Sequence, residues 1–464
     1  MRSWGDKLFT LLGPIRIYPE ASSLIDVIAL FFVDFAAMLR GRRPRLANMA
    51  RFFCQLTLGL LLLPVSLILA AAGFRVIYGT AFNQIGEAQL LDAAIREHLL
   101  LNRRRKLILV LGACQKGNRF LIKQYDTYLR VCEWSSISAL FWSILSYNPL
   151  IRHDVVTYNV AHENSKWSQL NRIWIKQERP PLIEPTYFEG DWGRFPEKLR
   201  AALESKQFVC VHSRDSGFYG WASRTTRDYD INTLVPLINR LGSIGIAVFR
   251  SGSKPQYVIP PGRLDYPSLY FDACDLTAQD QDVYMFSNCL FYLGCSSGPA
   301  EVPGTFGKNV YLTNVYPIVN GLRFLPGDLS VFKKIREVKT GKLLPFKNYF
   351  KPPFAQALQR PQLAQMGYHL EDNTEEEIMA GFIEFIAGLQ DQLPREFGNI
   401  ITAENESRET RPETPACASS RYLRKHHWSY RAAGIYGKAF MQLVGYQDLR
   451  EAGQSSVSSI LSQN

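Results

Sequence analysis

The chain has 464 residues, of which 47% are apolar and 20% are charged, so it can form two globular domains with extensions and is not intrinsically disordered. The formal net charge of +11 suits an anionic membrane surface or a nucleotide ligand. The basic residues are scattered without any zinc-finger, homeodomain or RNA-binding signature, so no nucleic-acid partner is expected. The eight cysteines form no CxxC pair and are expected to be buried, reduced thiols in a cytosolic compartment.

Residues 1–74 are expected to be a membrane-associated segment. Residues 24–39 are apolar except for two aspartates eight positions apart, which is typical of an amphipathic helix at a membrane or against a partner. Residues 56–74 carry no charge and are just long enough to span a bilayer; a buried core helix is the alternative. Pro64, near the middle, favours monotopic or re-entrant attachment over a full crossing, which would place the downstream chain outside the cytoplasm.

Residues 75–189 are expected to form a first α/β domain. The expected elements are a strand at 75–80, a helix from 87 to about 102, a strand at 106–112 and a helix at 118–129. Residues 177–196 contain four prolines and no helical period, which is typical of a connection between domains.

Residues 190–390 are expected to form a second α/β domain with a parallel sheet. The apolar runs predict strands at 208–212, 244–249, 269–272, 289–293 and 309–313, with helices at 195–205, 230–241, 275–286, 301–306 and 374–389. The last helix begins with Asn373 or Thr374 as its cap and three glutamates in its first turn. Residues 391–464 form a C-terminal tail, in which no fold is assigned from residue 401 onward.

Arginines and small residues follow three of these strands. Arg214 follows the first, Arg250 ends the second, and the fourth leads into the loop Gly294-Cys-Ser-Ser-Gly-Pro299 before a helix. In open α/β sheets, ligands bind beyond the carboxyl ends of the strands. Guanidinium groups and a loop of small residues at a helix start suit a phosphate-bearing ligand. For the loop alone, a plain strand-to-helix turn is the alternative.

The same loop also matches the GxSxG pattern of hydrolases. Ser296 would be the nucleophile, and Asp328 and His369 could complete a triad, although no HGGG-type oxyanion motif accompanies them. No P-loop, dinucleotide fingerprint or HExxH motif occurs.

No metal site is expected. The two DxD tripeptides, Asp228-Tyr-Asp230 and Asp280-Gln-Asp282, stand at helix starts, where acidic residues are common, and are interpreted as caps or solvated faces. His212 lies within a strand and is interpreted as a core histidine.

Several segments resemble the C-terminal half of a family of bacterial glycosyltransferases associated with surface-polysaccharide biosynthesis. They are VCVHSRDSGF (209–218), TTRDYDI (225–231), FRSG (249–252), the stretch MFSNCLFYLGCSSGPAEVPGTFGKNVYLTN (285–314), FKK (332–334) and DNTEEEI (372–378). The resemblance covers roughly residues 75–389 and is strongest over 208–314. The family is similar to two-domain GT-B enzymes such as fucosyltransferases and heptosyltransferases.

The resemblance implies two Rossmann-like domains in a GT-B-like arrangement, and the uncharged run at 56–74 adds a hydrophobic membrane-attachment helix before them. The resemblance implies transfer of a sugar from a nucleotide-sugar donor to a cell-surface polysaccharide acceptor, without a metal or other cofactor. The membrane segment favours a lipid-linked acceptor and a location at the cytoplasmic face of the inner membrane. By this likeness Arg214 and Arg250 face the nucleotide diphosphate, Ser296, Ser297 and Gly298 cradle a phosphate or the donor sugar, and Arg227 and Asn314 line the cleft.

The sequence departs from the family at two places. The family opens its first helix with Arg-Ile-Gly-His, where this chain has Gln84-Ile-Gly-Glu87, and the family's valine before the first arginine is Ser213 here. Glu87 is therefore the expected catalytic base, with an ordinary helix-start glutamate as the alternative. The departures favour a second hypothesis, a catalytically degenerate GT-B-like scaffold of a polysaccharide assembly complex. Another group transfer from an activated nucleotide or phosphate donor is a third.

Overall fold

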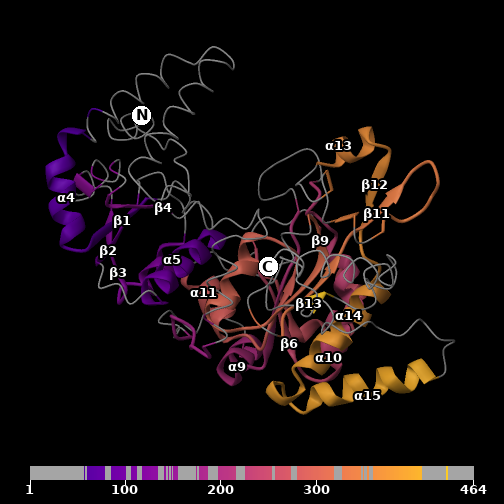
Figure 1. Ribbon diagram of the computed structural model, residues 1–464. Coiled ribbons are helices and arrows are strands. Elements are labelled where there is room, and N and C mark those ends of the chain that lie inside the picture. The colour runs from indigo at the N-terminus through magenta and orange to yellow at the C-terminus, as the bar shows by residue number, and fades with distance from the viewer. Residues whose placement is uncertain are drawn as a thin grey trace, which may run out of the picture. The chain divides into compact units, whose positions relative to one another are not determined.

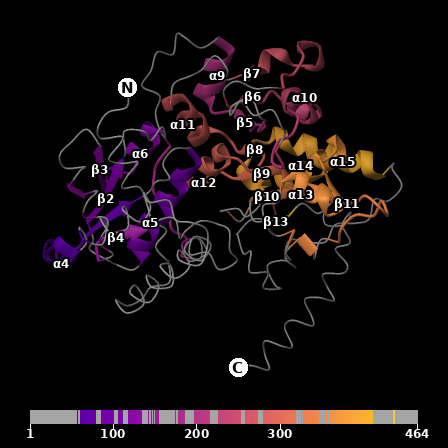
Figure 2. The ribbon, with the colours of Figure 1, turned by 90° about the horizontal axis from the view of Figure 1, so that it is seen from above.

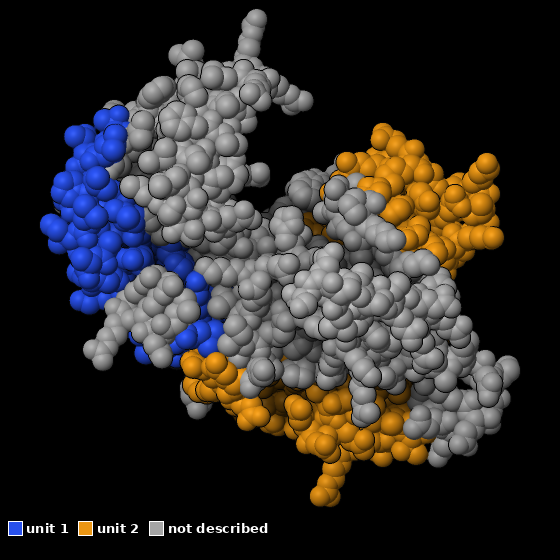
Figure 3. All heavy atoms as spheres, viewed as in Figure 1, with its two compact units in different colours: residues 1–159, 165–170 blue, residues 160–164, 171–464 orange. Residues whose placement is uncertain are grey.

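The structure of the protein is a computed structural model (Figure 1). The chain forms two compact units (Figure 3). Unit 1 comprises residues 1–159 and 165–170, and unit 2 comprises residues 160–164 and 171–464. The structure describes residues 57, 60–78, 85–100, 106–111, 118–133, 141–142, 145, 148, 150–154, 174, 177–185, 197–215, 225–252, 257–272, 279–317, 325, 327–345, 348–349, 353–354, 359–409 and 435–436. The expected segment at 24–39 lies outside these residues, and the predicted domain boundary at 189/190 stays a prediction.

Unit 1 is built on a parallel sheet with the strand order β3-β2-β1-β4. The strands are β1 (Phe74–Tyr78), β2 (Lys106–Leu111), β3 (Leu129–Glu133) and β4 (Arg152–Asp154), and the helical elements are α4 (Leu63–Ala71), η1 (Ile85–Glu87), α5 (Ala88–Leu100) and α6 (Arg119–Lys123). The apolar runs predicted as strands form β1 and β2. In α5, Asp92 is buried, pairs with Arg96 and accepts a hydrogen bond from Tyr125 Oη.

The predicted helix at 118–129 is too long. Asn118 caps α6 by accepting a hydrogen bond from Leu121 N at 2.9 Å, but the helix ends at Lys123. Tyr125 is buried beyond it, and the chain turns into β3 at Leu129. A five-residue helix is set by packing rather than by propensity, so the pattern did not reveal its end.

Unit 2 contains a parallel sheet with the strand order β13-β10-β9-β8-β5-β6-β7. Its strands are β5 (Phe208–His212), β6 (Ala247–Arg250), β7 (Tyr270–Asp272), β8 (Tyr292–Gly294), β9 (Val310–Val315), β10 (Leu329–Phe332) and β13 (Ile435–Tyr436). From β7 to β10 this is the order 3-2-1-4-5-6 of a doubly wound Rossmann sheet. The two parallel sheets confirm the predicted mixed α/β class.

Helices cover both faces of this sheet, with α10 and α14 on one side and α11 and α12 on the other (Figure 2). The helical elements are α9 (Glu197–Ser205), η4 (Ile231–Leu234), α10 (Val235–Ser243), η5 (Pro261–Arg263), η6 (Pro267–Leu269), α11 (Gln279–Asn288), η8 (Gly298–Glu301), α12 (Val302–Thr305), α13 (Arg360–Gln365), α14 (Glu375–Gly388), η11 (Gln390–Gln392) and α15 (Glu396–Glu409). An antiparallel pair, β11 (Lys334–Glu337) and β12 (Tyr368–Glu371), stands apart from the large sheet.

The C-terminal helices pack on the sheet through aromatic side chains. Phe291 lies 5.2 Å from Phe385 and 5.8 Å from Phe397 between ring centroids. Thr374 caps α14 in a capping box with Glu377, as predicted. The tail is not without structure, because Phe397 and Ile400 are buried and α15 continues to Glu409. Few residues of α15 are apolar, so the spacing of apolar residues in the sequence did not predict this helix.

Candidate functional site

The candidate site lies where the strand order of unit 2 reverses. β5 and β8 are neighbours, with His212 opposite Gly294, yet the chain leaves β5 toward β6 and leaves β8 toward β9. Loops that leave adjacent strands in opposite directions open a crevice, which is where doubly wound sheets bind ligands. The two loops are tied together, because Arg214 N donates a hydrogen bond to Cys295 Sγ at 3.3 Å. The structure thus brings Arg214 next to the predicted small-residue loop.

Gly294 allows the two strands to come this close. A Cβ atom at this position would lie 2.5 Å from the backbone oxygen of His212, which cannot move without disrupting β5. Any side chain here would separate the strand ends, so glycine is required by the close approach of the backbones.

Two buried hydroxyl groups at the crevice have no hydrogen-bond partner among the described residues. Ser213 Oγ follows β5 and Ser296 Oγ follows β8, and both side chains are buried. Ser297 Oγ, by contrast, donates to the backbone oxygen of Cys295 at 3.3 Å. A buried hydroxyl without a partner costs about 1–3 kcal/mol. The pair therefore marks a place where oxygen atoms of a ligand would be stabilised.

Arg214 is fixed by a buried carboxylate. Its Nε lies 3.2 Å from Oδ1 of Asp228, and this oxygen also accepts a hydrogen bond from Thr225 Oγ1 at 2.7 Å, while Oδ2 accepts one from Thr225 N at 2.7 Å. Asp228 is fully buried and the cap of η4 is Asp230, so the interpretation of Asp228 as a cap or solvated residue is wrong. Asp230 is a cap, as predicted, and accepts a hydrogen bond from Asn232 N.

A buried lysine holds the segment that carries Asp228. Lys333 Nζ donates to the backbone oxygen of Asp228 at 2.7 Å and pairs with Asp372 at 2.8 Å. Arg360 Nε donates to the backbone oxygen of Thr225 at 3.3 Å. Arg227 stands in this anchored segment with a half-buried side chain. Its assignment to the cleft stays a prediction.

Arg250 ends β6 and is buried among protein acceptors. Its Nη2 donates to the backbone oxygen of Tyr257 at 2.7 Å, and its Nη1 lies 3.3 Å from a carboxylate oxygen of Asp272. Asp215 Oδ2 accepts a hydrogen bond from Tyr257 N at 3.3 Å, so the Tyr257 segment bridges the ends of β5 and β6. Arg250 is thus beside the crevice, and its assignment to the diphosphate stays a prediction.

His212 is held in one tautomer. Its Nδ1 lies 3.0 Å from the backbone oxygen of Ser251, and because a carbonyl only accepts, Nδ1 carries the proton. Burial, with the nearby charges of Arg250 and Arg214, lowers the pKa of His212 to about 4, although the Ser251 hydrogen bond and the Asp215 carboxylate oppose the shift. The ring is therefore neutral at pH 7 and its Nε2 is an acceptor. Gly252, with φ of +110°, leaves the room that this ring occupies.

Asn314, the last residue but one of β9, has a left-handed conformation, with φ of +55°. Its backbone N donates to Asn373 Oδ1 at 2.6 Å, and Asn373 N donates back to Asn314 Oδ1 at 2.7 Å. Both residues are buried, and this reciprocal pair joins the end of β9 to the start of α14. A ligand role for Asn314 stays a prediction beside this bracing role.

Glu87 is the last residue of η1, directly before α5 and after β1 in the chain. Its side chain lies outside the described residues, so its role as a base stays a prediction.

The structure does not assemble the hydrolase triad. Ser296 Oγ has no hydrogen-bond partner among the described residues, so no histidine is placed to take its proton. His369 lies on β12 and its Nε2 contacts Glu371 at 2.8 Å. Asp328 accepts hydrogen bonds from the backbone N atoms of Val310 and Leu325.

Within the described part of the chain, no group of three or more His, Cys, Asp or Glu side chains could hold a metal ion. Four site residues escaped the sequence reasoning or were misread by it, namely His212, Ser213, Asp228 and Lys333. The position of His212 and Ser213 at the end of a strand was a usable signal. The burial of Asp228 and Lys333 was not visible, because their partners are distant in sequence.

Comparisons with known proteins give no family. No protein-family model and no curated protein matches the chain. Among solved structures, the dodecameric iron-containing heptosyltransferase TibC in complex with ADP-D-β-D-heptose matches with 12% identity and a TM-score of 0.32, over 53% of this chain and 60% of that one. TibC from enterotoxigenic E. coli matches with 13% identity and a TM-score of 0.30, over 52% and 57%. A glycosyl transferase family 9 protein of Veillonella parvula matches with 11% identity and a TM-score of 0.29, over 52% and 80%. The chain thus spans under two thirds of the TibC chains, and scores this low assign it no function.

Proposed function

We propose that this protein is a GT-B-like glycosyltransferase that moves a sugar from a nucleotide-sugar donor to a lipid-linked or cell-surface polysaccharide acceptor. The observation that carries the proposal is the meeting of Arg214, Ser213 and Ser296 at the reversal of strand order between β5 and β8. The motifs at these positions are those that resemble polysaccharide glycosyltransferases.

The crevice suits a nucleoside diphosphate sugar. The hydroxyls of Ser213 and Ser296, which have no partner among the described residues, can donate to phosphate oxygens, and Asp228 holds the Arg214 guanidinium in a fixed orientation. His212 offers an acceptor at Nε2, which suits a sugar or ribose hydroxyl rather than a phosphate. A ligand that has both phosphate oxygens and hydroxyl groups would use both kinds of group.

The reaction requires stabilisation of the leaving group and a general base. As the acceptor oxygen attacks the anomeric carbon, the bond from that carbon to the diphosphate breaks and negative charge develops on the diphosphate. Fixed donors such as Arg214 and the serine hydroxyls stabilise that charge without a metal. We assign Glu87 the removal of the acceptor's hydroxyl proton. The attachment is at the cytoplasmic face of the inner membrane, monotopic or re-entrant, which brings a lipid-linked acceptor near.

One observation favours the alternative of a catalytically degenerate GT-B-like scaffold. Arg214 and Arg250 are both paired with carboxylates of the same unit, Asp228 and Asp272, and such pairs also serve a purely structural role. Donor binding separates the two functions.

The test is thermal denaturation of the full chain with a panel of UDP-, GDP-, ADP- and CMP-sugars. We expect one nucleotide class to raise the melting temperature, because a ligand that binds only the folded state stabilises it. Arg214→Lys keeps a cation beside Asp228 but loses the guanidinium fork, so it should fold and lose most of the shift. Arg240→Ala, in the last turn of α10, is the matched control and should keep the shift.

A well-folded protein that responds to no donor would favour the scaffold. A shift that persists unchanged in Arg214→Lys would place the donor elsewhere.

A further inference from the structure

We propose that α4 lies flat in the surface of an anionic lipid bilayer and anchors unit 1 there through its solvent-facing apolar side. The inference deepens the membrane attachment contained in the proposed function, and it names the attaching surface and the kind of lipid.

One side of α4 is packed on the sheet of unit 1. Leu62 and Leu69 contact the core cluster that contains Val76 and Ile108, and Ser66 between them is fully buried. The spacing of four and three residues places these side chains on one face of the helix. The helix is therefore a fixed part of unit 1.

The opposite side of α4 and of the residues just before it is apolar and exposed. Leu60 and Leu61, which precede α4, are 62% and 70% exposed; within α4, Ile68 is 68% exposed, and Leu63, Val65 and Leu67 are exposed as well. This side forms the outer blue edge of unit 1 in Figure 3. Single exposed apolar residues are ordinary, but a continuous set on one short helix marks an interaction surface.

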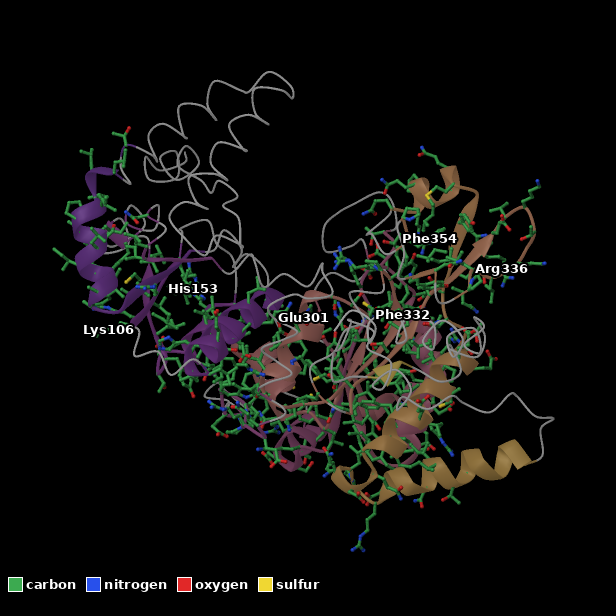
Figure 4. All side chains as sticks on the ribbon, in the orientation of Figure 1. Lys106, His153, Glu301, Phe332, Arg336 and Phe354 are labelled. Carbon is green, nitrogen blue, oxygen red and sulfur yellow. The ribbon has the colours of Figure 1, made fainter. Side chains whose placement is uncertain are left out.

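Aromatic side chains and a lysine lie on the strand that follows α4 and on its neighbours in unit 1. Phe74 stacks on Trp142 at 5.4 Å, and Trp142 packs edge-on to Phe141, which is 44% exposed. Lys106 Nζ lies 5.0 Å from the centre of the Phe74 ring (Figure 4). In the sequence, three further arginines precede Lys106. Aromatic side chains favour the bilayer interface, and each cation near an anionic surface contributes about 1 kcal/mol.

The geometry selects an in-plane helix. The nine residues of α4 are about 13 Å long, whereas the hydrocarbon core is about 30 Å thick. Among the described residues, no helix is both long and apolar enough to cross a membrane. Because one side of α4 is bound to the sheet, it cannot be surrounded by lipid. It can only lie with its outer side in the bilayer surface.

Lipid fits this surface better than a second protein. A face about 13 Å long and about 10 Å wide is far smaller than the roughly 800 Å² that each partner buries in a stable complex. Its described residues also include no polar side chain that would orient a protein partner. Lipid needs neither a large area nor orientation, and Lys106, with the three arginines before it in the sequence, favours anionic headgroups.

The test is flotation of the full chain with vesicles of phosphatidylcholine, with and without about one third phosphatidylglycerol. The variant is Leu61→Glu with Ile68→Glu. The matched control is Val258→Glu with Val338→Glu, two similarly exposed residues of unit 2 at 60% and 63%. We expect the wild type and the control to float with the anionic vesicles and less with the neutral ones. The partition of the α4 variant onto the anionic vesicles should be weaker by a factor of about ten or more, because two charges would have to enter lipid.

Three results would overturn the proposal. In the first, the α4 variant floats like the wild type. In the second, the wild type does not bind vesicles and light scattering shows that it is a dimer, whereas the α4 variant is a monomer. In the third, the variant melts well below the control without lipid, which would mean that another part of the chain covers α4. Donor binding is measured on the same variant, so loss of flotation with an intact donor shift leaves the proposed transferase standing.

Discussion

At the scale of single residues, the hydroxyls of Ser213 and Ser296 have no hydrogen-bond partner within the part of the chain that the structure describes, and this allows a role in binding to be distinguished from a role in folding. A group that serves only the fold would have a partner within it, as Ser297 has. We expect Ser296→Ala to leave the free energy of unfolding unchanged or to raise it by about 1 kcal/mol, because it removes an unsatisfied buried group. The same change should weaken donor binding about fivefold or more. Urea unfolding and calorimetric titration measure the two effects.

Ser297→Ala is the matched control, because it removes a hydroxyl that has a partner. It should cost about 1 kcal/mol of stability. A loss of stability in Ser296→Ala, with donor binding intact, would show that the hydroxyl serves the fold.

His212 predicts how stability changes with pH. Its pKa of about 4 in the folded state is below its ordinary value of 6.5, so the unfolded state binds more protons between these values. Stability is therefore fully present above pH 6.5 and falls as the pH drops toward 4. We expect this residue to contribute about 2 kcal/mol of the loss between pH 7 and 4.5.

Urea unfolding of the wild type and His212→Gln at the two pH values measures that contribution. The variant should lose correspondingly less stability on acidification. Equal losses in both proteins would mean that His212 is charged in the folded state.

At the scale of elements, the junction of β5 and β8 tolerates no side chain at Gly294. We expect Gly294→Ala to cost about 2 kcal/mol or more, because its Cβ meets the backbone of His212 rather than a movable side chain. Donor binding should fall as well, since the two loops separate. Gly262→Ala, where a Cβ meets nothing within 4 Å, is the control and should leave stability and donor binding nearly unchanged.

The junction of β9 and α14 depends on the pair of Asn314 and Asn373. Asn373→Ala leaves the Asn314 N–H and the backbone oxygen of Phe332 without their buried partner. We expect a loss of about 2–4 kcal/mol in urea unfolding. The exposed contact of Asn239 with the backbone of Arg263 is the comparison, and Asn239→Ala should cost less than about 1 kcal/mol. Similar losses in the two variants would contradict the bracing role.

The strands that the sequence predicted are those with continuous apolar runs, such as β5 and β9. The sequence did not predict the strand β11, because this segment begins with a lysine and its charged residues are typical of a solvated segment. The lysine before it, Lys333, is also buried, since Asp372 and the backbone of Asp228 neutralise and solvate it. Such partners are 39 and 105 positions away in the chain, so no local pattern could indicate them.

At the scale of the whole molecule, alternating apolar runs predicted two α/β units with parallel sheets, and both sheets are present. The sequence also placed Arg214 and the loop around Ser296 at strand ends, and the structure brings them together. The order of the strands was not predictable, because it is decided by how the helices pack over both faces rather than by any one strand. That order is what brings two loops that are distant in sequence next to each other.

The measurement that tests the central claim most directly is photoaffinity labelling of the full chain with an azido-nucleoside diphosphate sugar, followed by peptide mapping. The base chosen is the one that stabilises the protein in the donor panel. We predict labelling on peptides that follow β5, β6, β8 or β9, suppressed by excess unlabelled donor and reduced about tenfold or more in Arg214→Lys. Competed labelling confined to peptides away from these strand ends, such as α15, would contradict the account.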